Sequence, residues 1–397
     1  MAYVNNNKLE CLLFFLFASS YVLGDTFVCG RKIENMKNNV LVKRKGTIKT
    51  IEGEDGDIID CVDIYQQPAF DHPLLKNHTI QMKPSSISGG VKMNSSQAEL
   101  IQDWHKNGQC PKGTIPIRRE QQDEHPHGRG VKWIPRRTQL NQSINNDNHN
   151  EFATVDIEGG TFYGGRAILN VWNPVVYSNG DFSLAQIWVT AGPDKEVNTV
   201  EAGWKVDYPD RKTRLFIFWT GDGYKSKGCY NLECPGFVQI NHKFALGSPI
   251  KPVSRYSAQQ FEIGITIYKR KRNWWLHVQD QILGYWPGSI FHYLASTATR
   301  IVWGGEVYNT NPNGHHTRTQ MGSGHFGNEG YGKASYFRNI EYMDNYSGKF
   351  IYVQVRSLHA YATRPFCYNV EVANNTVGGF GTHFYFGGPG YSTLCAV

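Results

Sequence analysis

From about residue 150 onward, the sequence is a succession of short segments rich in β-branched and aromatic residues, separated by Gly, Asn, Asp or Pro. No helical spacing of apolar residues persists over a comparable length, so helices cannot supply the core. The pattern predicts an antiparallel all-β sandwich or flattened barrel. The segments are GRAILNVW, SLAQIWVTAG, NTVEAGWKV, TRLFIFWT, FEIGITIYK, NWWLHVQD, QILGYWP and RIVWGGEVYN.

The part of the chain before these segments has a different character. It carries charge and proline, whereas most of the ten tryptophans follow residue 140. The stretch DIIDCVDIY predicts a short strand, and SSQAELIQDWHKNG predicts a short helix or turn. We therefore expect a small mixed unit over residues 25–140, followed by the β-sandwich over residues 141–397.

The N-terminus indicates export. The run CLLFFLFASSYVLG, residues 11–24, is short, apolar and ends in small residues, and no later run is long enough to span a bilayer. We expect a signal peptide over residues 1–24 and a secreted protein that has no membrane contact afterwards, with the vacuole and the cell wall as open alternatives. Five N-x-S/T sequons fit this route and are candidate glycosylation sites: Asn77, Asn94, Asn141, Asn345 and Asn374.

Charge and histidine spacing argue against two classes of partner. The net charge of +7 is spread along the chain, and the only dense basic cluster, KRKR at 269–272, is interpreted as a solvated hairpin end. We expect no nucleic-acid partner. The histidines show no H-E-x-x-H spacing, and HPH at 125–127 has no partner cysteines, so we expect neither a metal site nor a cofactor. GSG at 322–324 lacks the frame of a nucleophile elbow and predicts a turn.

Two glutamates stand inside predicted strands. In NTVEAGWKV, alternation places Val200 and Trp204 on one face and Glu201 on the other, and Glu306 lies behind two glycines in IVWGGEVYN. Strands disfavour glutamate, so the pair is either a set of solvated surface residues or an acid/base pair. Spacing alone leaves both alternatives open.

Several long motifs resemble the plant neprosin family of glutamic endopeptidases. These are VNTVEAGWKV, TRLFIFWTGDGYKSKGCYNLECPGFVQIN, ILGYWPGSIF, VWGGEVYN and QMGSGHFGNEGYGKASYFRNI. The upstream stretches EDGDIIDCVDIYQQPAFDHPLLKNHTIQMKPS and GQCPKGTIPIRR resemble that family's activation peptide. The resemblance implies a secreted zymogen with a β-sandwich catalytic domain, which cuts polypeptides, typically after proline, with Glu201 and Glu306 as the catalytic pair. It also implies that the prosegment acts as an intramolecular inhibitor.

Such a pair has a defined chemistry. Two neighbouring carboxyls do not easily both ionise, so one pKa rises and the pair holds a proton over an acidic window. The ionised partner accepts a proton from the attacking water, and the protonated partner donates to the carbonyl oxygen or the leaving nitrogen. Gln186 on the neighbouring strand is a candidate oxyanion donor. Trp188 and Tyr308 are candidate walls for a proline ring, although ordinary core packing is the alternative for both.

Seven cysteines remain after removal of the leader, and in an oxidising compartment most should pair. We expect a local disulfide between Cys229 and Cys234. We also expect a C-terminal disulfide between Cys367 and Cys395, and one between Cys61 and Cys110 in the prosegment. Cys29 is left unassigned.

Two rival functions share these features: a glycoside hydrolase, and a catalytically silent, lectin-like wall protein. The long prosegment favours a peptidase, which we expect to be a monomer. The polar linker at 118–150 predicts the maturation site. Cleavage after Pro126 or Pro135 would start the mature chain at His127 or Arg136, with charging of His125 and His127 assisting release in acid. The alternative is an external protease at Arg118-Arg119 or Arg136-Arg137.

Overall fold

The computed structural model describes residues 43–85, 101–119, 149–310, 315–345, 348–373 and 379–395. The predicted leader, Cys29, most of the linker and the sequons at Asn94, Asn141 and Asn374 lie outside this part. Lys43–Val397 forms one compact unit. No helix in the described part is long and apolar enough to cross a membrane.

A seven-stranded antiparallel sheet carries both of the glutamates singled out above. Its order is β17-β4-β14-β6-β7-β8-β9, so β6 lies between the two strands that hold them. The strands are β17 (His359–Ala362), β4 (Asn150–Phe162), β14 (Ala298–Tyr308), β6 (Phe182–Ala191), β7 (Asn198–Asp207), β8 (Arg214–Thr220) and β9 (Gly228–Tyr230).

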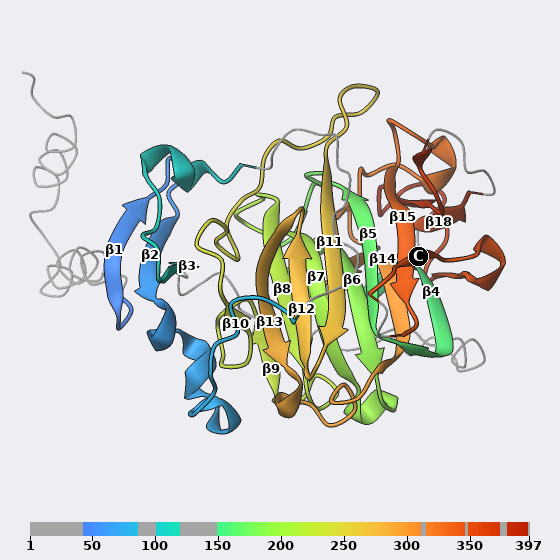
Figure 1. The fold of residues 1–397 in the computed structure, drawn as a ribbon. Helices are drawn as coiled ribbons and strands as arrows, with labels where there is room; N and C mark the ends of the chain where they lie inside the picture. Colours follow the sequence, from blue (N-terminus) through green and yellow to red (C-terminus); the bar gives the residue numbers. More distant parts are fainter. Residues whose placement is uncertain are drawn as a thin grey trace, which may run out of the picture. The chain divides into compact units, whose positions relative to one another are not determined.

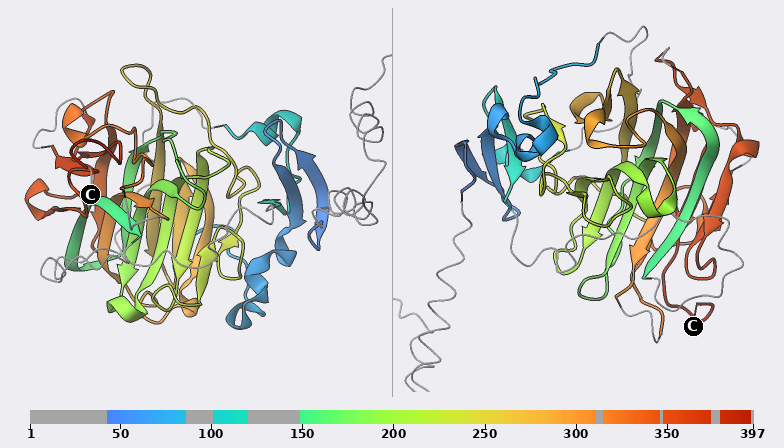
Figure 2. Two further views of the ribbon diagram at one scale, coloured as in Figure 1. Left: turned by 180° about the vertical axis from the view of Figure 1, so that it is seen from behind. Right: turned by 90° about the horizontal axis from the view of Figure 1, so that it is seen from below.

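A nine-stranded antiparallel sheet forms the second layer. Its order is β10-β13-β12-β11-β5-β15-β19-β18, with β16 paired to β15. In Figure 1, β11, β12 and β13 lie in front of β6, β7 and β8, and the view from behind in Figure 2 reverses this order. The strands are β10 (Val238–Gln239), β13 (Gln281–Pro287), β12 (Asn273–Val278), β11 (Glu262–Arg270), β5 (Gly164–Asn170), β15 (Ser335–Met343), β19 (Phe384–Gly387), β18 (Asn369–Val372) and β16 (Ile351–Tyr352).

The two sheets share one hydrophobic core. On β7, Val200, Ala202, Trp204 and Val206 are fully buried in it, and β11 contributes its isoleucines from the other layer. Alternating residues of both sheets therefore point inward, as the period-two pattern requires. The predicted all-β sandwich is confirmed.

The N-terminal part forms a small three-stranded sheet with short 3₁₀ turns, and it belongs to the same compact unit as the sandwich. The predicted domain boundaries at residues 25 and 140 stay a prediction. The strands of the small sheet are β1 (Thr47–Glu52), β2 (Ile58–Asp63) and β3 (Thr114–Arg118), paired in that order. Amide side chains join it to the sandwich. Gln102 exchanges two 2.8 Å hydrogen bonds with the backbone of Ala245, and Gln67 bonds the backbone of Gln239 in the same reciprocal way.

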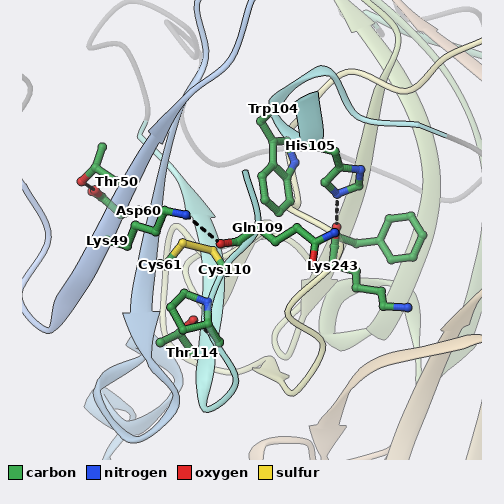
Figure 3. The surroundings of a disulfide bond; sticks show 12 residues. Lys49, Thr50, Asp60, Cys61, Trp104, His105, Gln109, Cys110, Thr114 and Lys243 are labelled. Carbon is green, nitrogen blue, oxygen red and sulfur yellow. Dashed lines mark hydrogen bonds between the residues drawn. A yellow bond between two sulfur atoms is a disulfide. The ribbon is translucent and has the colours of Figure 1, made fainter. Parts of the chain in front are cut away.

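All three predicted disulfides are present, namely Cys61–Cys110, Cys229–Cys234 and Cys367–Cys395. Cys61–Cys110 ties β2 to the segment before β3, where Lys49 Nζ also donates to the carbonyl of Gln109 at 3.1 Å (Figure 3). Two of the sequon residues, Asn77 and Asn345, are exposed in the described part, so their glycosylation stays a prediction.

The basic cluster at 269–272 is only partly as predicted. Lys271 and Arg272 form the exposed turn between β11 and β12. Lys269, however, is 3% exposed, and its ammonium donates to the carbonyl of Leu294 at 3.0 Å. Strand alternation turns Lys269 inward, and a backbone oxygen supplies the acceptor that a buried ammonium needs.

Candidate active site

Glu201 and Glu306 lie on the face of the seven-stranded sheet that points away from the main core. Glu201 pairs directly with Trp188 on β6, and Glu306 pairs with Leu184 on the same strand. Directly paired residues of antiparallel strands share a face, so all four side chains project the same way. Strand alternation, which turns Val200 and Ala202 into the core, therefore places Glu201 opposite to them.

This face is buried. A second apolar cluster covers it, and Glu201 and Glu306 are 1% and 0% exposed. The alternative that the two glutamates are solvated surface residues is therefore wrong. The cluster consists of Phe152, Phe182, Leu184, Trp188, Val197, Phe216, Phe218, Tyr224, Tyr230 and Val302.

Gln186 lies midway between the two carboxyl-bearing positions. It pairs with Gly203 on β7 and with Gly304 on β14, so the directly paired residues on both neighbouring strands have no side chain. Neither glycine can be replaced freely. A Cβ on Gly203 would lie 2.0 Å from the carbonyl oxygen of Ala185, and Gly304 has a φ of +151°. The glycines thus keep the space on both sides of Gln186 free of side chains.

Glu201 is held by hydroxyl donors. Thr199 Oγ1 and the Tyr224 hydroxyl donate to its Oε1 at 2.6 and 2.8 Å. Burial raises the pKa of Glu201 to about 7, and hydrogen bonding to Thr199, Tyr224 and Gln186 partly offsets this rise. Tyr224 comes from the loop after β8, and no sequence pattern identified it. Thr199 shares the face of Glu201 by alternation, so it could have been found.

Glu306 has no hydrogen-bond partner for either carboxyl oxygen in the described part of the chain. Burial, followed by the charge of Glu201, holds its pKa well above the usual range, while the ammonium of Lys205 acts in the opposite direction. Lys205 is itself fixed, since it lies over the rings of Phe182 and Tyr230 and pairs with Asp207 at 2.7 Å. Sequence reasoning placed Lys205 on this face but gave it no role.

The two carboxyls are coupled without touching. They flank β6 from opposite sides and are offset by four residues along it, which on a flat sheet separates their Cα atoms by about 16 Å. The charge of Glu201 still contributes to the raised pKa of Glu306. A direct carboxyl–carboxyl hydrogen bond is not present.

The two predicted aromatic walls differ in position. Trp188 is fully buried beside Glu201. Tyr308, two residues after Glu306, is stacked between Phe182 and His149 at ring distances of 5.4 and 5.3 Å. Trp188 therefore adjoins the pair directly, whereas Tyr308 belongs to an aromatic stack at the end of β14.

Two groups of side chains in the described part have ligand-like spacing for a metal ion. One contains Cys367 and Cys395, whose sulfurs are bonded to each other. The other contains Asp156, Glu158 and His359. In this group the carboxylate of Asp156 already pairs with the guanidinium of Arg300 at 3.0 Å. Neither group includes Glu201 or Glu306.

Comparison with known proteins gives two family matches. Residues 179–389 match the family described as Neprosin, and residues 50–156 match the Neprosin activation peptide. The first match includes Glu201, Glu306 and Gln186. The second match includes β2, β3 and the part of β1 from Thr50 onward. Together they support a peptidase made as a precursor with an activation peptide.

Among solved structures, the chain is similar to scytalido-glutamic peptidase with a transition-state analogue inhibitor and to SCP-B, a member of the eqolisin family of peptidases. Each of these two structures is 10% identical to this chain, and each match covers 60% of this chain and 97% of the peptidase, with a TM-score of 0.32. A homodimeric agglutinin from chicken liver is 8% identical and covers 38% of this chain and 92% of its own, with a TM-score of 0.22. Such low scores carry no functional inference. The family match, which spans more than half of the chain, does carry one: this protein belongs to the neprosin family.

Proposed function

We propose that this chain is the precursor of a glutamic endopeptidase in which Glu201 and Glu306 together hydrolyse peptide bonds. The observation that carries the proposal is a pair of buried, electrostatically coupled carboxyls on one sheet face, with the amide of Gln186 between them. Burial of two carboxyls costs stability, and groups with strongly raised pKa values gather at functional sites.

The surroundings of the two carboxyls assign their roles. In the closed precursor, burial outweighs the two hydroxyl hydrogen bonds that Glu201 accepts and raises its pKa to about 7. Opening of the site relieves this desolvation, and the two hydrogen bonds then favour the ionised form, so Glu201 is the general base that takes a proton from the attacking water. Glu306 lacks such donors, and burial together with the charge of Glu201 holds its pKa well above the usual range, so it is the general acid. Its proton passes to the carbonyl oxygen or to the leaving nitrogen as the C–N bond breaks. The Gln186 amide donates to the developing oxyanion.

Specificity for proline remains part of the proposal. Trp188 adjoins Glu201 and offers a flat apolar face to a proline ring, as the resemblance to the family implies. Tyr308 is a weaker candidate, because its ring is already stacked on both sides.

The described state is a closed one. Both carboxyls are buried, so a substrate must displace what covers them before hydrolysis. We propose that self-cleavage after Pro126 or Pro135, in the linker outside the described residues, removes the activation peptide. The apolar cluster over the pair, whose side chains all belong to the sandwich, can then rearrange to admit a substrate. The rival cut at Arg118-Arg119 is disfavoured: Arg118 is 8% exposed within β3, and Arg119 pairs with Asp60 at 2.6 Å.

N-terminal sequencing of acid-treated protein tests this route. Wild type should start at His127 or Arg136, and Glu201→Gln, purified free of other proteases, should stay uncut. Equal processing of both proteins excludes self-cleavage.

The function itself is tested on the processed chain with proline-containing peptides and with plant polysaccharides at pH 3 to 7. Peptide cleavage in acid, with intact polysaccharides, supports the proposal. Polysaccharide cleavage indicates a glycoside hydrolase, and glycan binding without any cleavage indicates a lectin-like protein. Secretion and a monomeric state remain parts of the proposal, and they predict the protein in culture medium at the mass of a single chain.

A further inference from the structure

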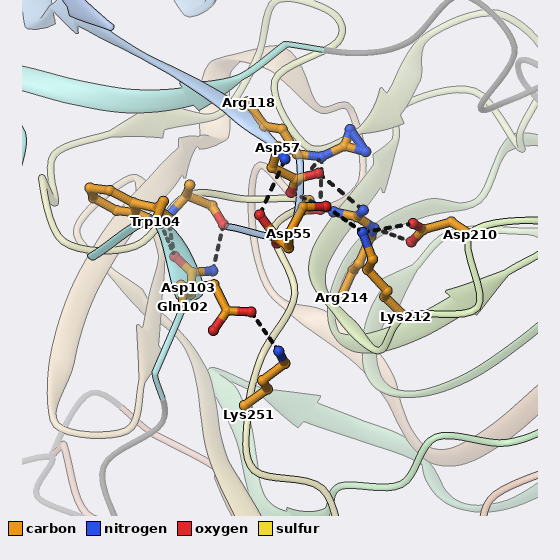
Figure 4. Close-up of polar contacts among 12 residues, drawn as sticks. Asp55, Asp57, Gln102, Asp103, Trp104, Arg118, Asp210, Lys212, Arg214 and Lys251 are labelled. Atoms are coloured by element: carbon orange, nitrogen blue, oxygen red, sulfur yellow. Dashed lines mark hydrogen bonds and ion pairs between the residues drawn. The ribbon is translucent and has the colours of Figure 1, made fainter. Parts of the chain in front are cut away.

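A buried ion pair joins the activation-peptide part to the sheet that carries the glutamates. Arg214 on β8 donates from Nη1 to Asp57 Oδ2 at 2.7 Å and from Nη2 to Asp57 Oδ1 at 3.1 Å (Figure 4). Both residues are 7% exposed. The opposite side of the guanidinium is fixed, since Nε donates to Asp210 at 2.7 Å. This forked contact is the geometry by which arginine recognises a carboxylate.

The arginine lies on the same face as the two glutamates. Arg214 pairs with Lys205 on β7, Lys205 pairs with Leu184 on β6, and Leu184 pairs with Glu306 on β14. Three strand spacings of about 4.8 Å separate Arg214 from Glu306, or about 14 Å. An extended peptide covers this distance with about four residues at ~3.3 Å each. Sequence reasoning gave Arg214 no role.

A pocket occupies the space beside this row. Lys205, Phe216 and Tyr230 line it from the sheet, Arg214 lies at its edge, and Ile117 and Arg118 close it from β3. Asp207, Asp210 and Glu233 also line the pocket, so a preference for carboxylate is expected at the Nη1–Nη2 edge of Arg214 and not throughout the pocket.

Loss of the activation peptide changes this site in one specific way. Asp57 and Arg118 both lie before the proposed cleavage sites and leave together. Asp210 and the carbonyl of Gly247, the other acceptors of Arg214, belong to the sandwich and stay. The Nη1–Nη2 edge of a guanidinium already held in position then loses its carboxylate. A buried guanidinium that has lost a carboxylate partner is stabilised by binding another carboxylate.

We propose that Arg214 is a substrate subsite of the processed enzyme, which binds a peptide carboxylate three to four residues from the scissile bond. Asp57 occupies this subsite in the precursor as an internal stand-in for that carboxylate. The inference rests on the proposed peptidase function and specifies its substrates. The carboxylate is an acidic side chain or a free C-terminus.

The test uses processed enzyme and proline-containing peptides in which Asp or Asn is placed in turn at each position up to five residues from the cut. A second set compares free with amidated C-termini and so separates the two carboxylate sources. At one position the carboxylate peptide should have a kcat/KM about ten times that of the amide, because a charged hydrogen-bonded pair is gained. The preference should fade below about pH 4, where Asp is protonated.

Arg214→Gln should abolish the preference. Because this change leaves Asp57 only the longer contact with Arg118 Nε at 3.4 Å in the precursor, it is made together with Asp57→Asn, which removes both charges. Arg211→Gln, at an exposed arginine in the same β7–β8 turn, is the matched control and should keep the preference. Cleavage of the amide peptides should stay within about twofold of wild type in Arg211→Gln, and circular dichroism verifies the fold of the Arg214 variant.

Binding of the same peptides to processed protein, measured by fluorescence anisotropy, separates this inference from the peptidase proposal. If no peptide is cleaved but wild type still binds the carboxylate form about tenfold more tightly, and the Arg214 variant does not, the catalytic proposal fails and the subsite stands. If neither cleavage nor binding distinguishes Asp from Asn, or if the Arg214 variant retains the preference, the subsite is refuted.

Discussion

The raised pKa of Glu201 predicts that the stability of the precursor falls as the pH rises. The carboxyl titrates at about 7 when folded and near 4.5 when unfolded, so between these values the unfolded chain releases a proton that the folded chain retains. The contribution of the Glu201 carboxyl to the free energy of unfolding is fully present below pH 4.5 and is lost as the pH rises through 7. A difference of about 2.5 units at 1.36 kcal/mol each corresponds to about 3 kcal/mol.

The measurement needs an inactive background, since wild type is expected to process itself in acid. We compare Glu306→Gln, in which Glu201 still titrates, with the double variant Glu201→Gln/Glu306→Gln. The free energy of unfolding in urea should be equal for both at pH 4. At pH 8 the double variant should be more stable by about 3 kcal/mol.

Glu371→Gln, at an exposed glutamate on β18, is the control and should leave the free energy of unfolding unchanged at both pH values. If the stability difference between the single and double variants is the same at pH 4 and pH 8, Glu201 does not titrate as a buried carboxyl. The roles proposed for the pair then lose their basis.

Three further predictions concern packing, docking and mechanism. Gly203→Ala should destabilise the fold by about 3 kcal/mol or more, because its Cβ meets a neighbouring carbonyl, whereas Gly221→Ala, with no atom closer than 3.5 Å, should have little effect in the same urea titration. Hydrogen bonding and attraction to Lys251 lower the pKa of Asp103, so this contact stabilises the precursor above about pH 4 and is lost as the pH falls further. Asp103→Asn should therefore reduce the urea midpoint at pH 6 but not at pH 2.5. Peptide cleavage rates should be unaffected by chelators and by serine- or cysteine-directed reagents, since the mechanism uses only proton transfer.

The sequence predicted the sandwich and the sheet face of Glu201 because both depend on local alternation, whereas the pairing of Glu201 with Glu306 came from the family resemblance. The period-two pattern of β7 placed Glu201 away from the core before any contact was known. The disulfides were predicted from the positions of the cysteines along the chain. These features need no knowledge of long-range contacts.

Features that depend on long-range packing were not predictable in the same way. Burial of Glu201 requires a second apolar cluster built from five strands and the loop of Tyr224, which contributes a hydrogen bond from 23 residues away. The pairing of Asp57 with Arg214 joins residues 157 apart in sequence. Lys269 was misjudged as solvated, because a basic run gives no sign of which side chain finds an internal acceptor.

The central claim is that Glu201 and Glu306 together carry out hydrolysis. It is tested most directly by the turnover of a proline-containing peptide at acidic pH. Wild type, Glu201→Gln, Glu306→Gln and Glu371→Gln are compared after processing by the same external protease, with circular dichroism to verify the fold. Both active-site variants should lose about a thousandfold or more in kcat, because glutamine keeps the shape but neither accepts nor donates the proton. Glu371→Gln should match wild type. Near wild-type turnover in either active-site variant would contradict the account.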